Sequence, residues 1–205
     1  MAEMVIVITI IGILFTIGGS TYRNQRNQFQ FNDSLTKTLE IIKTARNYAI
    51  TSRAYWNGAT SEIPKEGYGV YIERTAHPNG TDNTGRLVLF ANTSTSGTAN
   101  NQYDNNEGFE EEYLLPLDTN FVGLIGYDSN GAVVPTPNNK VVILFRPPLA
   151  DVFMAYNPTA LPSTPDDVLE ITDLEIQLKR VGAPATSPAT VIKMNRISGF
   201  PEIEL

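Results

Sequence analysis

The chain has 205 residues, a net charge of −7 at pH 7, a pI near 4.7 and no cysteine. This length is enough for one compact domain with a sizeable core. The acidic balance argues against a nucleic-acid-binding protein, which would show a basic patch. The lack of cysteine excludes disulfides and cysteine-ligated zinc sites.

The first feature along the chain is an apolar run that follows a single carboxylate. Glu3 precedes an uncharged run at 4–19, and the next ionisable residue is Arg23. A charge placed in hydrocarbon costs roughly 2.5–3.5 kcal/mol, so it usually persists because something pairs with it. We therefore expect Glu3 to pair with the chain's own terminus or with another molecule, which points to assembly.

Other interpretations of this apolar run stay open. A cleaved secretory signal would begin with basic residues rather than with Glu3. A single-pass membrane anchor needs about 20 apolar residues, slightly more than residues 1–19 supply. A buried core helix is disfavoured because polar residues begin abruptly at Ser20.

Three glycines lie in or at the end of the run. Gly12, Gly18 and Gly19 each cost about 1 kcal/mol relative to alanine in a helix. Glycine also permits close approach of helix backbones in a membrane or a packed bundle. We expect these three positions, together with Glu3, to act in assembly.

The start of the chain resembles a known family. Residues Ala2-Glu3-Met4-Val5-Ile6-Val7-Ile8-Thr9-Ile10-Ile11-Gly12-Ile13-Leu14 are similar to the N-terminal signature of type IV pilins and type II secretion pseudopilins. The resemblance implies that Glu3 pairs with the N-terminal ammonium of a neighbouring subunit. It also implies three partners: a prepilin peptidase, an inner-membrane assembly platform and an ATPase. The family's mature chain begins four positions before the glutamate, so we expect two residues and a basic leader to precede Met1.

A second, looser similarity is to the pseudopilin-H and minor-pilin subgroup. It rests on Ala45–Ile50, Trp56, Gly67–Tyr71 and Ile197–Gly199.

Beyond Thr21 the apolar spacing is typical of an amphipathic helix. Apolar or small residues step by three or four along one face, at Phe31, Leu35, Leu39, Ile42, Ala45, Ala49 and Ser52. This pattern predicts either one helix from Glu3 to about Arg53, or two helices with a joint around residues 18–32.

The remainder of the chain is dominated by predicted strands. Alternating or continuous apolar residues indicate strands at 68–73, 86–90, 121–127, 140–145, 170–178 and 191–197, with a turn at Asp128–Gly131 before a further short strand. The order predicts an α+β fold with a long N-terminal helix packed on an antiparallel β-sheet head, as in pilins. We expect an apolar helical segment at 1–24, serving as membrane anchor and filament core, and a globular head at 25–205.

Candidate chemistry is sparse. The single histidine, His77, lies in a predicted turn. With no cysteine and no second histidine, we expect neither a histidine-dependent triad nor a Cys/His zinc site, and no enzyme activity. Asp104, Asn106 and Glu107 offer oxygen ligands for Ca²⁺, but they lack the spacing of an EF-hand loop, and a solvated acidic loop is favoured. No phosphate-binding loop is present, and no cofactor is expected.

These features predict a structural subunit of a type IV pilus-like filament, a homopolymer built through the apolar helix. The chain is expected in the bacterial inner membrane before assembly and in an extracellular filament afterwards, with no nucleic acid bound directly. The alternatives are a minor pseudopilin of a type II secretion system and a membrane-anchored adhesin that does not polymerise. Two polar insertions, Thr93–Asn106 and Pro158–Asp167, are either recognition loops or solvated spacers.

Overall fold

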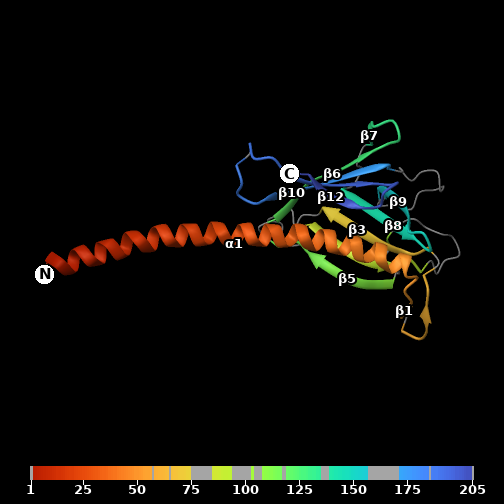
Figure 1. Ribbon diagram of the computed structural model, residues 1–205, viewed down its shortest axis with the longest axis horizontal. Helices are drawn as coiled ribbons and strands as arrows, with labels where there is room; N and C mark the ends of the chain where they lie inside the picture. Colours follow the sequence, from red (N-terminus) through yellow and green to blue (C-terminus); the bar gives the residue numbers. More distant parts are fainter. Residues whose placement is uncertain are drawn as a thin grey trace.

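A computed structural model describes residues 2–56, 58–64, 66–74, 85–93, 103, 108–116, 119–134, 139–156, 171–184 and 186–204. Within these ranges, the side chains at 2, 3, 17, 18, 20, 21 and 108–110 lie outside the description. Figure 1 shows a long helix, α1, whose C-terminal half lies on a head of β-strands and whose N-terminal half extends away from it.

The helix α1 runs from Ala2 to Ile50, which makes 49 residues, or about 74 Å. Its C-terminal half buries Leu35, Ile42, Ala45 and Ala49, four members of the predicted apolar face. The helix ends where Ser52 adopts a positive φ of 45°, which redirects the backbone.

The strands of the described chain form three antiparallel sheets. One sheet has the order β12-β11-β10-β6-β7, another β5-β4-β3-β8-β9, and β1-β2 is a separate hairpin. The strands are β1 Tyr55–Trp56, β2 Ser61–Glu62, β3 Tyr68–Arg74, β4 Gly85–Ala91, β5 Gly108–Leu114, β6 Thr119–Tyr127, β7 Val133–Val134, β8 Lys140–Arg146, β9 Asp151–Tyr156, β10 Asp173–Arg180, β11 Thr190–Asn195 and β12 Pro201–Glu204.

One core joins the helix to both five-stranded sheets. Ile42 of α1, Ile143 of β8 and Ile176 of β10 are each fully buried in the same apolar cluster. The opposite face of the β5-β4-β3-β8-β9 sheet holds a second buried cluster, where Tyr103 stacks on Tyr71 with ring centroids 4.6 Å apart. Because both faces of β8 are covered, its five central residues are all buried.

The predicted fold class is therefore wrong. The sequence predicts a long helix packed on a single antiparallel sheet, whereas the protein is mostly β, with its strands divided among three sheets and α1 in contact with both larger ones. The division arises from pairings between strands far apart in the chain, β3 with β8 and β6 with β10. Local alternation predicts a strand but does not determine which strand it pairs with.

The small β1-β2 hairpin projects from the head beyond the C-terminal end of α1 (Figure 1). It carries Trp56, which is 61% exposed, and Ile63 follows it with a similar exposure of 53%. The hairpin adds little to the shared core, since only Tyr55 of its residues packs against that core.

The expected membrane anchor is also wrong. Among the described residues, no helix combines the length and apolar character needed to cross a membrane.

Candidate assembly interface

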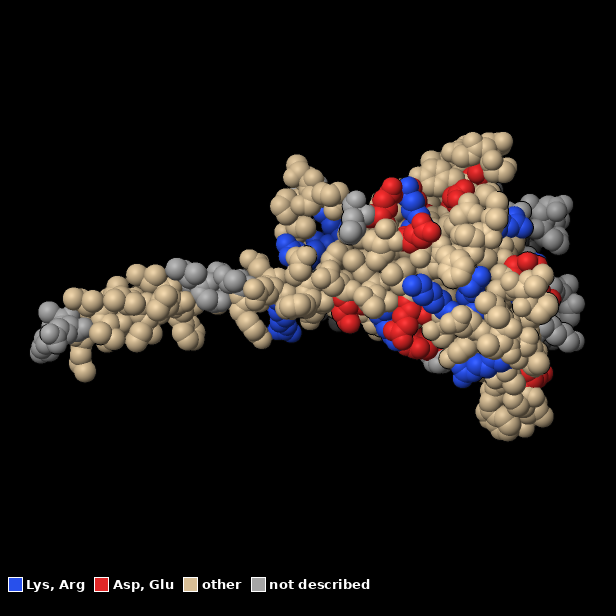
Figure 2. Space-filling model, viewed as in Figure 1, with Lys and Arg blue, Asp and Glu red and all other residues tan. Residues whose placement is uncertain are grey.

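The N-terminal half of α1 presents bare apolar side chains. Ten large apolar residues are between 52% and 81% exposed: Met4, Val5, Ile6, Val7, Ile8, Ile10, Ile11, Ile13, Leu14 and Phe15. On the face drawn in Figure 2, the coloured lysines, arginines, aspartates and glutamates gather on and near the head, and the described residues of the protruding end of α1, drawn tan, show none. We call residues 4–15 the apolar arm.

The apolar arm has no single buried face. Met4, Val5, Ile6, Val7 and Ile8 are all more than half exposed, although successive residues point about 100° apart around a helix. A helix that is apolar on every side is stable in a protein when other elements surround it. The head therefore leaves the whole circumference of the arm to be covered by something else.

The threonine hydroxyls within the arm and directly after it are satisfied within the helix. The Thr9 hydroxyl donates to the Val5 carbonyl at 2.7 Å, and the Thr16 hydroxyl donates to the Gly12 carbonyl at 2.8 Å. Both threonines thus turn their hydroxyls onto the backbone of the helix. Burying the arm would leave neither hydroxyl without a partner.

The predicted assembly residues all lie on α1, but the structure describes them to different extents. A Cβ atom built at Gly12 or at Gly19 would meet nothing within 4 Å, so the chain's own packing does not require glycine at either position. Gly18 lies in the helix between them. The Glu3 backbone is helical, whereas its carboxylate lies outside the described side chains, so its pairing stays a prediction.

A shallow apolar groove of about 450 Å³ extends from the arm toward the head. It is lined by Ile11, Leu14, Phe15, Gly19 and Tyr22, and the missing side chain of Gly19 leaves space between the two aromatic rings. The sequence pattern of the apolar run does not predict the aromatic part of this surface.

Three exposed aromatic residues continue this side of the helix. Phe15, Tyr22 and Phe29 are 81%, 71% and 71% exposed and lie seven residues apart, which places them on one side of α1. Tyr22 and Phe29 stand among polar residues in the sequence. Their spacing of seven residues is the sequence signal that could have identified them as part of this surface.

The chain matches no family model, no curated protein and no solved structure. The similarity of Ala2–Leu14 to the pilin signature therefore rests on those residues alone. Any function assigned to the chain depends on the geometry of α1 and the head.

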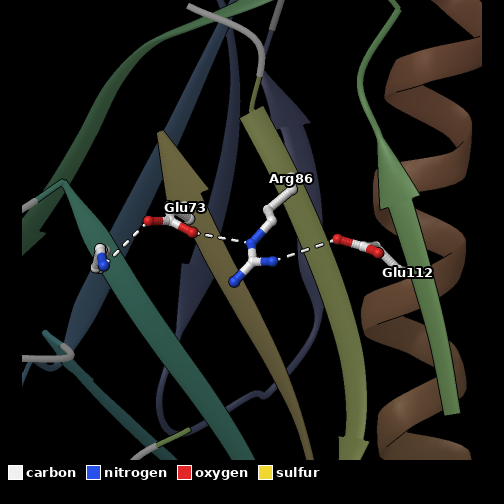
Figure 3. Close-up of polar contacts among 4 residues, drawn as sticks. Glu73, Arg86 and Glu112 are labelled. Atoms are coloured by element: carbon white, nitrogen blue, oxygen red, sulfur yellow. Dashed lines mark hydrogen bonds and ion pairs between the residues drawn. The ribbon is translucent and has the colours of Figure 1, made fainter. Parts of the chain in front are cut away.

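An ionic network of four described side chains crosses the β5-β4-β3-β8-β9 sheet. Figure 3 shows Glu73 and Arg86 side by side, with Glu112 on the other side of the guanidinium. The Arg86 Nε lies 2.8 Å from Glu73 Oε2, the Lys140 Nζ lies 3.0 Å from Glu73 Oε1, and Arg86 lies 3.4 Å from Glu112. Burial by itself would lower the pKa of Lys140, but the hydrogen bond and charge of Glu73 raise it above its ordinary value.

This network suits a structural role. The Glu73 carboxylate is only 10% exposed and lies between cations on both neighbouring strands. Ion pairs from one carboxylate to cations on both neighbouring strands hold β3 in register with β4 and β8. The network joins β8, β3, β4 and β5 into one ion-paired surface.

The candidate calcium ligands are not placed by the structure. Asp104, Asn106 and Glu107 lie outside the described residues, as do His77 and most of the two polar insertions. Within the described part of the chain, no group of three or more carboxylate or histidine side chains could hold a metal ion. The turn at Asp128 is a local structure, because its carboxylate accepts the backbone N–H groups of Asn130 and Ala132.

Proposed function

We propose that this chain is a structural subunit of a type IV pilus-like filament that assembles by packing its apolar arm against the arms of identical copies. The observation that carries the proposal is the exposure of ten large apolar side chains on a helix that extends beyond the head. Contiguous exposed apolar surface of this kind marks an interaction site. The similarity of Ala2–Leu14 to the pilin signature supports the same function.

The area of the arm is large enough to drive association. Burying a large aliphatic or aromatic side chain contributes about 1.5–3 kcal/mol, so covering half the surface of ten such residues contributes on the order of 10 kcal/mol. Association costs about 4–15 kcal/mol in lost translational and rotational freedom. Contact along one face alone would barely offset this cost, whereas contact on all sides would exceed it.

The distribution of the apolar surface favours a bundle over a dimer. A dimer of helices buries one stripe, normally every third or fourth residue. The arm exposes five consecutive large apolar residues, Met4–Ile8, which only several surrounding helices could cover together. A filament core built from many copies provides these neighbours and leaves the heads outside.

The glycines fit close packing between copies. Each glycine in a helix costs about 1 kcal/mol relative to alanine, and no contact within the chain offsets this at Gly12 or Gly19. Close approach of a neighbouring backbone would offset it. The resemblance further implies that Glu3 sets the register by pairing with the N-terminal ammonium of a neighbour.

Two matched substitutions test the proposal. Leu14→Asp places a charge within the arm, while Asn24→Asp adds the same charge at an exposed polar position of the same helix. We expect Leu14→Asp to reduce fibre yield at least about tenfold, because a buried unpaired carboxylate is costly, and Asn24→Asp to leave it near the unsubstituted level. Negative-stain electron microscopy and sedimentation measure the fibre yield. Circular dichroism checks that the heads of the two variants unfold at the same temperature.

Glu3→Ala is a third variant in the same experiment. We expect it to impair incorporation into fibres while the head stays folded. A purified chain that remains monodisperse with its arm intact would contradict the filament, and normal fibre yield from Leu14→Asp would exclude the arm as the contact. Normal yield from Glu3→Ala alone would remove only the pairing role.

A further inference from the structure

A cavity of about 450 Å³ on the head gathers three arginines from distant parts of the chain. Arg46 comes from α1, Arg146 from the end of β8, and Arg196 from the turn that follows β11. Residues 149–153, in the β8-β9 connection and the start of β9, line the rest of the cavity together with Ile197 and Ser198. This cavity lies in the head, away from the apolar arm.

Each guanidinium is held by a different contact. The Arg46 Cζ lies 3.9 Å from the centroid of the Phe200 ring, and the Arg196 Nε donates to the Val152 carbonyl at 3.2 Å. The Arg146 Nε lies 3.6 Å from Glu66 Oε2. Contacts of this kind limit the conformations of a long side chain, so a ligand would lose less entropy in binding it.

The turn that carries Arg196 approaches the cavity closely. Gly199 has a positive φ of 62°, and a Cβ atom built on it would lie 2.6 Å from Val152 Cγ2 and 3.5 Å from Arg46 Nε. Glycine at this position therefore permits both the turn and its contact with α1 and β9. The backbone brings Arg46 and Arg196 to one wall.

The cavity is positively charged in a negatively charged protein. Arg46, Arg146 and Arg196 contribute three positive charges, and Asp151 in the wall and Glu66 beside Arg146 contribute two negative ones, which leaves +1 (3 − 2). The whole chain carries −7. Anions are therefore attracted to this cavity against the field of the rest of the molecule.

We propose that this cavity binds a phosphate group carried by a small ligand. Guanidinium groups match phosphate oxygens in charge and geometry, and three of them suit a group that offers three oxygens and nearly two negative charges. The volume lies within the range of small-molecule sites. Leu149 and Ile197, 78% and 92% exposed, flank the arginines and provide an apolar surface for the organic part of the ligand.

Isothermal titration calorimetry of the full-length chain with inorganic phosphate at low salt tests the site. The variants Arg196→Gln and Arg46→Gln remove one cation each, and Arg180→Gln is the matched control outside the cavity, where its Nη1 contacts Gln28. We expect each cavity variant to weaken phosphate binding about tenfold, and the control to bind as the unsubstituted chain does. Arg196 is exposed, so its variant keeps the test valid if Arg46→Gln fails to fold.

Two further probes separate phosphate recognition from general attraction of anions. Acetate should bind at least about tenfold more weakly than phosphate, because it offers two oxygens and one charge. Phenyl phosphate should bind more tightly than inorganic phosphate, and Ile197→Ser should remove that gain. Absence of phosphate binding up to roughly 10 mM, equal binding by the cavity variants, or equal binding of acetate would each overturn the proposal.

Discussion

At the residue scale, Glu73 is a nearly buried acid on the head that forms ion pairs with two basic side chains. Its two oxygens face Arg86 on β4 and Lys140 on β8, and only 10% of the side chain is exposed. Both cations depend on the same carboxylate, whereas Glu112 reaches Arg86 at a longer distance and is 39% exposed. Glu73 should therefore contribute clearly more than Glu112 to the free energy of unfolding.

We expect Glu73→Gln to lower the free energy of unfolding by about 1–3 kcal/mol. Glutamine preserves the shape but leaves Arg86 and Lys140 near each other without the intervening negative charge. Chemical denaturation followed by circular dichroism measures the change. Glu112→Gln is the matched control and should cost no more than about 0.5 kcal/mol, because surface ion pairs contribute little. Equal losses from the two variants would show that Glu73 holds no special position.

At the scale of elements, one hydroxyl ties the two large sheets together. Tyr156 on β9 accepts the Gly126 N–H of β6 at 2.6 Å and donates to the Val134 carbonyl of β7 at 3.1 Å. The Tyr156 hydroxyl approaches the backbone of β6 this closely because position 126 lacks a side chain. A Cβ atom there would lie 2.1 Å from Ile171 Cγ2. The edge strand β9 of one sheet is thus joined to β6 and to the edge strand β7 of the other by hydrogen bonds as well as by packing.

Tyr156→Phe should destabilise the head by about 1–3 kcal/mol, since it removes both hydrogen bonds from a buried position. Thermal unfolding of the full-length chain is the measurement. Tyr22→Phe, at a tyrosine that is 71% exposed, makes the same chemical change on α1 and should leave the midpoint unchanged. An unaltered midpoint for Tyr156→Phe would mean that packing alone holds the sheets together.

The strands can largely be predicted from local pattern, and their arrangement cannot. Alternation correctly places Leu174, Ile176 and Leu178 on one buried face. The continuous apolar run of β8 marks a strand with five buried residues, although β3 and β4 bury six each. The pairing of β6 with β10 and its irregularity between Gln177 and Leu178 depend on contacts between distant segments. A single-sheet head is therefore a natural but wrong prediction.

The two candidate surfaces also differ in whether the sequence alone could predict them. The apolar arm is contiguous in the chain, so its amino-acid composition alone indicates an interface. The three arginines of the head cavity lie 100 and 50 residues apart, 46 to 146 and 146 to 196, and no local motif connects them. Spacing rules find sites that lie on one element, and they miss those assembled by tertiary contacts.

At the scale of the whole molecule, net charge opposes the assembly that the arm favours. Each chain carries −7, and in a filament the heads would lie close together around the packed arms. Repulsion between like-charged heads extends about 30 Å at 0.01 M salt and about 8 Å at 0.15 M. Salt should therefore strengthen assembly while leaving the contacts of the arms intact.

We expect the fraction of sedimentable fibre to rise several-fold as sodium chloride increases from about 0.01 M to 0.15 M. Analytical ultracentrifugation gives the fraction, and Leu14→Asp is the control, which should stay dispersed throughout the range. A fall in fibre with added salt would contradict this expectation, because it would mean that attraction between opposite charges holds the copies together.

The position of Trp56 has a practical consequence. It is the protein's one tryptophan, and its indole already faces water at the tip of the small hairpin. Its emission spectrum will thus shift little when the core melts, and a fluorescence unfolding curve would have a small amplitude. The same indole offers a sensitive reporter of anything that docks on the hairpin tip, since contact there would shield it from quenchers such as acrylamide.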